Sequence, residues 1–141
     1  MFTPLTFTGK SATNAIKLTQ VNSPDAITLK YSKNGGEWTD YTINNIISLA
    51  NGDTVAFSGA NDHFSKNDSN SYYFQMTGSI EADGNVQSLV NFSDTCSGSC
   101  FIYLFNYCTS LVKAPALPAT TLGDNCYKLM FQNCSNLTAA P

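Results

Sequence analysis

Residues 100–115 read CFIYLFNYCTSLVKAP, and residues 126–141 read CYKLMFQNCSNLTAAP. The second stretch repeats the first at a constant offset of 26 residues. Both cysteines, a phenylalanine, a leucine, an alanine and a proline return at equivalent places, and Leu104 matches Met130. A period between about 20 and 50 residues is typical of solenoids, in which each unit buries its apolar side by stacking on the next one. Such arrays usually present a surface for binding, so the repeat indicates recognition.

The composition excludes several classes of protein. Hydrophobic residues make up 43% of the 141 residues, which is enough for a folded core. Charged residues make up only 12%, about half the usual share, so Ser, Thr, Asn and Gln must cover the surface. This habit is more frequent in extracellular and virion β-proteins than in cytosolic enzymes. The basic residues are scattered lysines without any arginine, which argues against a nucleic-acid partner.

The chain lacks the patterns of membrane insertion and export. It contains no run of 18 apolar residues, so we expect no membrane span. Its first residues, MFTPLTF, lack the basic and apolar regions of a signal peptide. We therefore expect either that an export signal has been removed or that the protein does not use one.

Residues 1–90 predict short β-strands separated by turns. Apolar and polar residues alternate with a period of two, which places one face of each strand inward. A hairpin turn is expected at Asn34-Gly35-Gly36, because a two-residue turn needs positive φ at both central residues, and a second turn at Asn51-Gly52-Asp53. The expected strands cover residues 5–8, 15–19, 26–31, 37–42, 46–49, 54–57, 72–76 and 79–82. Strands at this spacing favour an antiparallel β-sandwich.

Residues 91–141 predict a different unit, with a boundary in the turn-rich segment 90–98. Residues 126–132 have helical spacing, with Thr121 or Asp124 available as the N-cap. Residues 111–117 contain Pro115 and are followed directly by Pro118, so they cannot form a long central strand. A short helix followed by a short extended piece is the leucine-rich-repeat unit. The predicted fold is therefore mainly β: a β-sandwich domain over 1–90, followed by a short leucine-rich-repeat (α/β solenoid) extension over 91–141 with about two repeats.

Two stretches carry a resemblance to a known family. The first reads Phe105-x-x-Cys108-x-x-Leu111-x-x-Ala114-Pro115-x-Leu117-Pro118-Ala119-Thr120-Thr121-Leu122, followed by Cys126-Tyr127-x-x-Met130-Phe131. It resembles the BspA-like leucine-rich repeats of surface proteins from gut Bacteroidetes. The second stretch includes Tyr31-Ser32-x-x-Gly35-Gly36-x-Trp38 and Gly84-Asn85-x-x-Ser88-Leu89, and it resembles the β-domain that often precedes those repeats.

The resemblance implies a surface-exposed binding protein, or a relative carried by a phage. The family's arrays usually run to many coils, whereas residues 100–141 hold about two. Fewer than three repeats are marginally stable. We therefore expect a truncated or naturally short array that is stabilised by packing against the β-domain.

The five cysteines leave several interpretations open. Four of them, Cys100, Cys108, Cys126 and Cys134, occupy equivalent places in the two repeats, and Cys96 has no counterpart. We favour buried thiols that pack as small hydrophobic side chains. A disulfide between stacked equivalents, Cys100–Cys126 or Cys108–Cys134, is the main alternative. A zinc site is disfavoured because residues 96 and 100 lack a partner pair at the usual ligand spacing.

Catalytic and cofactor-binding patterns are weak, and we predict a protein that is not an enzyme, with no cofactor and no metal. His63 is the only histidine and lies in a polar loop over residues 59–71, so neither a cysteine nor a serine nucleophile has an evident base. The oxygen-rich residues 61–68 lack the spacing of a calcium loop. Glu81 and Asp83 share one face of a strand, which is more typical of a wet surface than of a glycosidase pair.

Aromatic residues are the best candidates for recognition. Trp38 is expected to pack in the core or against Tyr31 across the hairpin. On the repeats, exposed tyrosines would provide stacking platforms for sugars or anchors for a protein. The candidate binding surface consists of Tyr103, Tyr107, Tyr127 and Lys128.

The sequence therefore predicts a non-catalytic adhesion or recognition module that binds a protein or a glycan through its repeat face, at a cell surface or outside the cell. An alternative is a phage virion protein, a capsid decoration or fibre on the virion exterior. Its β-domain would anchor to capsid or tail proteins, and such a protein is expected to form symmetric homo-oligomers.

Overall fold

The computed structural model describes residues 3–139 and residue 141. It is mainly β, as predicted, and is built from open sheets, with no α-helix among the described residues. One hydrophobic cluster extends from Leu5 in the first strand to Cys134 near the C-terminus. Both the predicted β-domain and the predicted repeat segment contribute to it, so the boundary near residue 90 remains a prediction.

The larger sheet has six strands. β1 (Leu5–Gly9) lies between β8 (Ile80–Asp83) and β6 (Thr54–Ser58) and pairs with both in antiparallel register. β6 continues to β3 (Lys30–Lys33) and β4 (Thr39–Asp40), while β10 (Leu111–Lys113) is added in parallel at the other edge, next to β8. Burial alternates along β1 and β6, which is the period of two that the sequence predicts.

The smaller sheet has three strands in the order β5 (Ile47–Ala50), β2 (Thr13–Val21) and β7 (Ser71–Thr77), all antiparallel. Its inner face packs against the larger sheet. The Phe74 ring of β7 lies 5.1 Å from that of Phe7 in β1 and 5.4 Å from that of Phe57 in β6, in edge-to-face contacts. The opposite face of the sheet, with Lys17 and Gln75, remains accessible.

Local turn chemistry matches the sequence at both hairpins. Asn34 and Gly35 have φ of 52° and 71°, as a two-residue turn requires. At the second turn Gly52 has φ of 88°, and the Asp53 carboxylate accepts a hydrogen bond from the Ala50 N–H at 2.9 Å.

Several strand predictions are wrong in extent. Residues 26–29 are not in a strand, and only Thr39–Asp40 of the predicted strand 37–42 pairs with β3. Trp38 is not a core anchor: it is 45% exposed, and it is Thr39 that pairs with Tyr31. Tyr31 instead packs against the rings of Tyr41 and Phe57. Tyr41 is buried, and its hydroxyl accepts a hydrogen bond from the Leu18 N–H.

A short 3-10 helix, η1 (Val86–Val90), follows β8. Asn85 caps it by accepting a hydrogen bond from the Gln87 N–H. Every residue of η1 is buried. The loop before β7, which the sequence marks as polar, also contributes a fully buried side chain, that of Phe64.

The predicted helix over residues 126–132 is wrong. Residues 97–108, here called the first coil, and residues 123–134, the second coil, are each a run of β-turns. In each coil every fourth residue has left-handed φ, between 53° and 62°: Ser99, Tyr103 and Tyr107, then Asn125, Leu129 and Asn133. Buried residues such as Cys126, Met130 and Cys134 also recur every four positions. A spacing of four resembles that of a helix, which explains the error.

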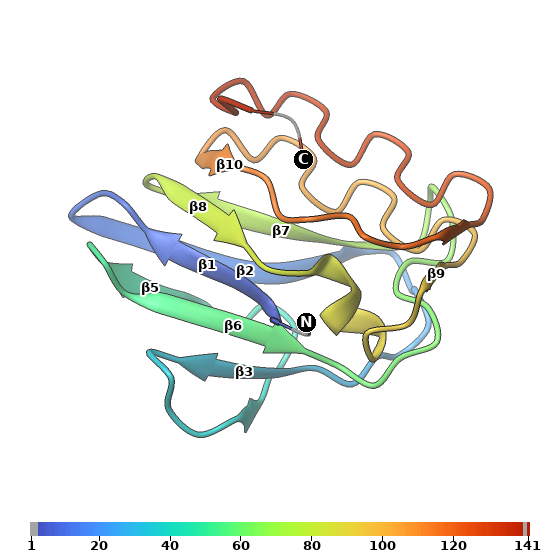
Figure 1. Cartoon of the computed structure of the whole chain (residues 1–141), viewed down its shortest axis with the longest axis horizontal. Helices are drawn as coiled ribbons and strands as arrows, with labels where there is room; N and C mark the ends of the chain where they lie inside the picture. The colour runs from blue at the N-terminus through green and yellow to red at the C-terminus, as the bar shows by residue number, and fades with distance from the viewer. Residues whose placement is uncertain (1–2, 140) are drawn as a thin grey trace.

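The two coils lie side by side (Figure 1). Five backbone N–H groups of the first coil donate to carbonyls of the second over 2.8–3.1 Å: Ser99 to Asp124, Phe101 to Cys126, Tyr103 to Lys128, Phe105 to Met130 and Tyr107 to Gln132. Before them, β9 (Thr95–Cys96) pairs in parallel with β11 (Thr121–Leu122). After them, the Thr138 N–H donates to the Val112 carbonyl. Ala140, the counterpart of Ala114, lies outside the described residues.

The first coil is also bound to β7 and to the loop before it. Its Cys100 and Leu104 carbonyls accept hydrogen bonds from the N–H groups of Ser65 and Phe74, both at 2.8 Å. The Phe105 ring stacks on that of Phe74, with the centroids 5.5 Å apart. The coil therefore extends the core of the two sheets and forms a wall beside β7.

Candidate functional site

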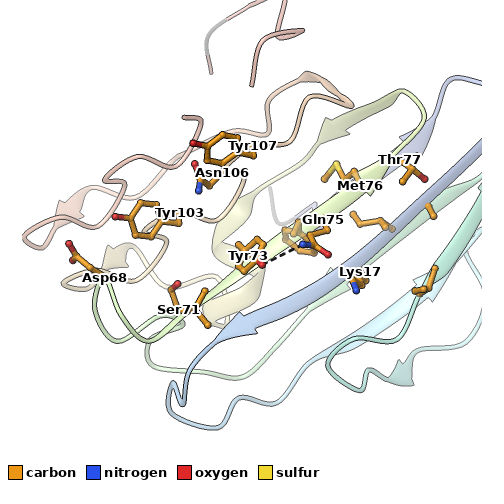
Figure 2. A pocket seen from close by; sticks show the side chains of 15 residues that line it. Lys17, Asp68, Ser71, Tyr73, Gln75, Met76, Thr77, Tyr103, Asn106 and Tyr107 are labelled. Atoms are coloured by element: carbon orange, nitrogen blue, oxygen red, sulfur yellow. Dashed lines mark hydrogen bonds between the residues drawn. The ribbon is translucent and has the colours of Figure 1, made fainter. Parts of the chain in front are cut away.

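A groove of about 760 Å³ lies where the outer face of the three-stranded sheet meets the first coil. Its floor comes from β2 and β7, and its wall comes from the coil, as Figure 2 shows. The residues that give it chemical character are Lys17, Asp68, Tyr73, Gln75, Tyr103, Asn106 and Tyr107. Apolar side chains, including those of Ile46 and Met76, complete the lining.

Tyr103 and Tyr107 owe their position to the turn geometry of the coil. Both have left-handed φ, 62° and 60°, which bulky side chains rarely adopt. At these positions the side chain points away from the buried residues of the coil. Tyr107 is 65% exposed and Tyr103 is half-buried. A non-glycine residue in this conformation costs about 1–2 kcal/mol. Asparagine or glycine would be less strained at these two positions of the first coil, yet both positions are tyrosine.

The floor of the groove follows from strand alternation. Phe74 and Tyr72 of β7 are buried, so Tyr73 and Gln75 face outward. The Gln75 side-chain amide donates to the Tyr73 hydroxyl at 3.4 Å. On the neighbouring strand β2, Lys17 is paired with Gln75 in register and lies on the same face. The floor therefore combines one aromatic ring, one amide and one cation.

Two polar atoms at the groove lack a partner. The Ser71 hydroxyl and the Asn106 side-chain oxygen are buried and make no hydrogen bond within the described residues. A buried polar group without a hydrogen-bond partner lowers the stability of the fold, and such groups are rare in native proteins. Both side chains line the groove.

The structure separates the four residues of the predicted surface. Tyr103 and Tyr107 line the groove together. Lys128 forms an ion pair at 3.2 Å with Asp68, which is itself a lining residue, so Lys128 lies at the rim. The Tyr127 ring instead stacks on that of Phe101 at 6.4 Å. Burial, with a smaller contribution from Cys96, raises the pKa of the Tyr127 hydroxyl.

The five cysteines are free and buried, as expected of thiols that act as small hydrophobic side chains. The equivalent residues Cys108 and Cys134 make equivalent contacts. The Cys108 thiol donates to the Phe74 carbonyl at 3.1 Å, and the Cys134 thiol donates to the Phe105 carbonyl at 2.9 Å. Burial raises the pKa of both thiols. These cysteines therefore connect layers of the structure and do not face the groove.

The other candidates for chemistry have local partners. The His63 ring lies 3.0 Å from the carboxylate of Asp25, and both side chains are partly exposed. Glu81 and Asp83 form ion pairs with Lys10 and Lys113 respectively. No group of three or more His, Cys, Asp or Glu side chains that could hold a metal ion occurs in the described part of the chain.

Sequence patterns do not single out Tyr73, Gln75 or Asn106, although these side chains share the groove with Tyr103 and Tyr107. The alternation along residues 71–77 places Tyr73 and Gln75 on one face. It does not reveal that a coil thirty residues further along the chain lies against that face. The missing information is the long-range packing of β7 against the first coil.

No protein-family model, curated protein or solved structure matches this chain. Within residues 3–139 and residue 141, no helix is long and apolar enough to cross a membrane. The functional argument therefore depends on the groove itself.

Proposed function

We propose that this protein is a non-catalytic recognition module that binds its ligand in the groove between β7 and the first coil. The observation that carries the proposal is the arrangement of three tyrosines, Tyr73, Tyr103 and Tyr107, around one groove. Two of them are held there in a backbone conformation that tyrosine disfavours. Strained positions of this kind persist where the surrounding structure imposes them, often at ligand sites.

A glycan is the ligand class that fits these side chains best, and a protein segment is the alternative. Aromatic faces stack on the apolar faces of sugar rings. Side-chain amides, such as those of Gln75 and Asn106, both donate and accept hydrogen bonds, as sugar hydroxyls do. Of the groove's charges, Asp68 is already paired with Lys128. Lys17, the other charge in the lining, makes no ion pair within the described residues. A ligand that is neutral or carries a single negative group is therefore favoured over a highly charged one.

We further propose that the two coils belong to a BspA-like leucine-rich array carried on a β-sandwich. The hydrogen bonds between equivalent segments of the two repeats support this interpretation. Stacked rings at the repeat offset support it as well: Phe105 on Phe131 at 5.5 Å and Phe101 on Tyr127 at 6.4 Å. In this arrangement the sandwich and the first coil together form the ligand groove.

The test is a binding measurement with a panel of neutral polysaccharides, by affinity electrophoresis and then by calorimetry. The informative variant is Tyr107→Asn, which gives the first coil the residue that the second coil has at the equivalent position, Asn133. Asparagine tolerates left-handed φ, so the unfolding free energy should stay the same or rise by up to about 1 kcal/mol. Glycan affinity should fall about tenfold, because the loss of one stacking ring costs about 1.4 kcal/mol.

Trp38→Ala provides the matched control. Trp38 is an exposed aromatic residue that does not line the groove, so its removal should leave glycan binding unchanged. An equal loss in both variants would indicate nonspecific stacking and contradict the proposal. Binding that survives Tyr107→Asn combined with Tyr103→Asn would also contradict it.

We propose a cell-surface or extracellular location, in line with the resemblance and with the low share of charged residues. The virion exterior is the alternative, because that composition also suits a capsid decoration or fibre protein. Mass spectrometry of purified phage particles and of washed bacterial surfaces distinguishes the two locations. Copies in particles would support the virion alternative, and copies only in the cell-surface fraction would contradict it.

A further inference from the structure

We propose that the outer edge of the second coil is a docking edge for a further coil of the same repeat, carried by the same polypeptide. The argument depends on the direction of the hydrogen bonds in the coils and is independent of the groove.

Each coil divides its backbone N–H groups into two sets. In the first coil, the N–H groups of even-numbered residues donate to the carbonyl three residues earlier and close the turns, for example Leu104 to Phe101 and Cys108 to Phe105. The N–H groups of odd-numbered residues, from Ser99 to Tyr107, donate sideways to the second coil. In all five backbone hydrogen bonds between the two coils, the first coil is therefore the donor.

The second coil repeats this pattern, but in the part of the chain that the structure describes no segment pairs with its donor side. Its turns close in the same way, for example Met130 to Tyr127. The N–H groups that correspond to the sideways donors of the first coil make no hydrogen bond within the described residues: Asn125, Tyr127, Leu129, Phe131 and Asn133. In Figure 1 the second coil, drawn in red, is the outermost layer of the stack. The edge is thus a row of five donors.

The side chains at this edge also continue an existing stack. The rings of Phe74, Phe105 and Phe131 follow one another, with centroids 5.5 Å apart at each step. Phe131 is the last ring of this row and Tyr127 the last ring of a second row, and both are only half-buried. Leu129, between them, is 41% exposed. A neighbour that offers apolar rings in the same register would cover all three side chains.

The polarity of the edge decides what can occupy it. A second copy of this protein would present the same row of donors, and two donor rows cannot pair in a symmetric dimer. A coil of the same repeat presents a row of carbonyls at matching spacing, as the second coil does to the first. A free coil of this length lacks a core of its own and would be disordered. A tether to the same polypeptide provides it at high effective concentration.

Amide hydrogen exchange tests the proposal on the protein as it is and on an extended form. The extension duplicates residues 116–141 after Pro141, and its control appends the same residues in shuffled order. In the unextended protein the amides of Tyr127, Leu129, Phe131 and Asn133 should exchange rapidly, while those of Phe101 and Phe105 should be protected. The duplicated repeat should slow the four edge amides on the order of a hundredfold or more, and the shuffled repeat should not.

Each other outcome overturns the proposal. Slow exchange of the edge amides in the unextended protein together with a dimeric mass would make a second copy the occupant. Slow exchange in a monomer would mean that the edge is not free. An extension that gives the edge amides no more protection than the shuffled control would show that the edge does not select a coil of this repeat. Glycan binding by the unextended protein is a separate measurement, so failure of either proposal can be recognised on its own.

Discussion

At the residue scale, single polar side chains connect segments that lie far apart in the chain. Ser88 in η1 is fully buried, and its hydroxyl accepts a hydrogen bond from the Leu5 N–H at 3.0 Å and donates to the Phe57 carbonyl at 2.8 Å. It thus supplies partners to two neighbouring strands of the larger sheet at the point where their own ladder ends.

Substitution of Ser88 by alanine should therefore destabilise the protein. Loss of the hydroxyl leaves a buried N–H and a buried carbonyl without this partner, and each such group typically costs 1–3 kcal/mol. We expect the unfolding free energy to fall by about 2 kcal/mol, measured by urea denaturation. Ser48→Ala on the exposed face of β5 is the control, with an expected change below about 0.5 kcal/mol. Equal effects of the two substitutions would contradict this role of Ser88.

At the element scale, close approach between chain segments constrains the backbone. Gly84 follows β8, has φ of 76°, and would place a Cβ atom 2.1 Å from the Pro4 carbonyl oxygen. Gly35 in the first hairpin has a similar φ of 71°, but a Cβ atom there would meet nothing within 4 Å. The two glycines therefore have the same conformational requirement and different surroundings.

Alanine at these two positions should separate the conformational cost from the steric cost. Gly35→Ala should lower the unfolding free energy by about 1 kcal/mol, the cost of left-handed φ in a residue with a side chain. Gly84→Ala should lower it by more than about 2 kcal/mol, because the backbone at Pro4 must also move. Urea denaturation of both variants checks this difference. If the two substitutions lower the unfolding free energy by the same amount, the close approach at Gly84 does not contribute to the difference in stability.

Elements also show where sequence patterns mislead. The buried residues Cys126, Met130 and Cys134 recur every four positions and predict a helix, yet the coil uses turns. A helix would use most of its N–H groups internally. The first coil instead directs alternate N–H groups to its neighbour. Pairing with another segment of the chain therefore overrides the local pattern.

At the scale of the whole molecule, the first coil and the two sheets share one core. The Phe105 ring of the first coil contacts Phe7 and Phe74 from the two sheets, with centroids 6.1 Å and 5.5 Å apart. All five cysteines are buried within or beside this core. The stability of the whole molecule should therefore depend on the ionisation of its thiols.

Stability should fall as the pH rises above about 9. Burial raises the pKa of Cys108 and of Cys134. In the unfolded chain these thiols ionise near the ordinary value of 9.0. Below that pH both states hold the proton. Above it only the unfolded state loses the proton and is stabilised, by about 1.4 kcal/mol per pH unit for each thiol.

Urea denaturation between pH 7 and pH 10 measures this dependence. Cys108→Ala should be less stable than the parent at pH 7 but should lose stability less steeply above pH 9. A thiol assay under denaturing conditions should detect five reactive groups. A count of three or one would reveal disulfides, and a stability that does not change up to pH 10 would contradict the buried-thiol interpretation.

Local information in the sequence was sufficient for several features. Alternation of apolar residues predicts β1, β2, β6 and β7, because only one face of each strand meets the core. Asn-Gly pairs predict both hairpins, because few residues tolerate the required φ. The 26-residue offset predicts which segments are equivalent. Tyr103 and Tyr107, which the sequence predicts as binding residues, both line the groove, and their role in binding stays a prediction.

Only the tertiary structure decided what these features form together. The groove exists because the first coil packs beside the outer face of β7. No pattern in the sequence indicates that these two segments are in contact. The tertiary structure also decides that Trp38 is exposed. It likewise decides that a row of N–H groups on the second coil makes no hydrogen bond within the described residues. Propensity and periodicity act over a few residues, whereas register and packing between distant segments depend on the whole core.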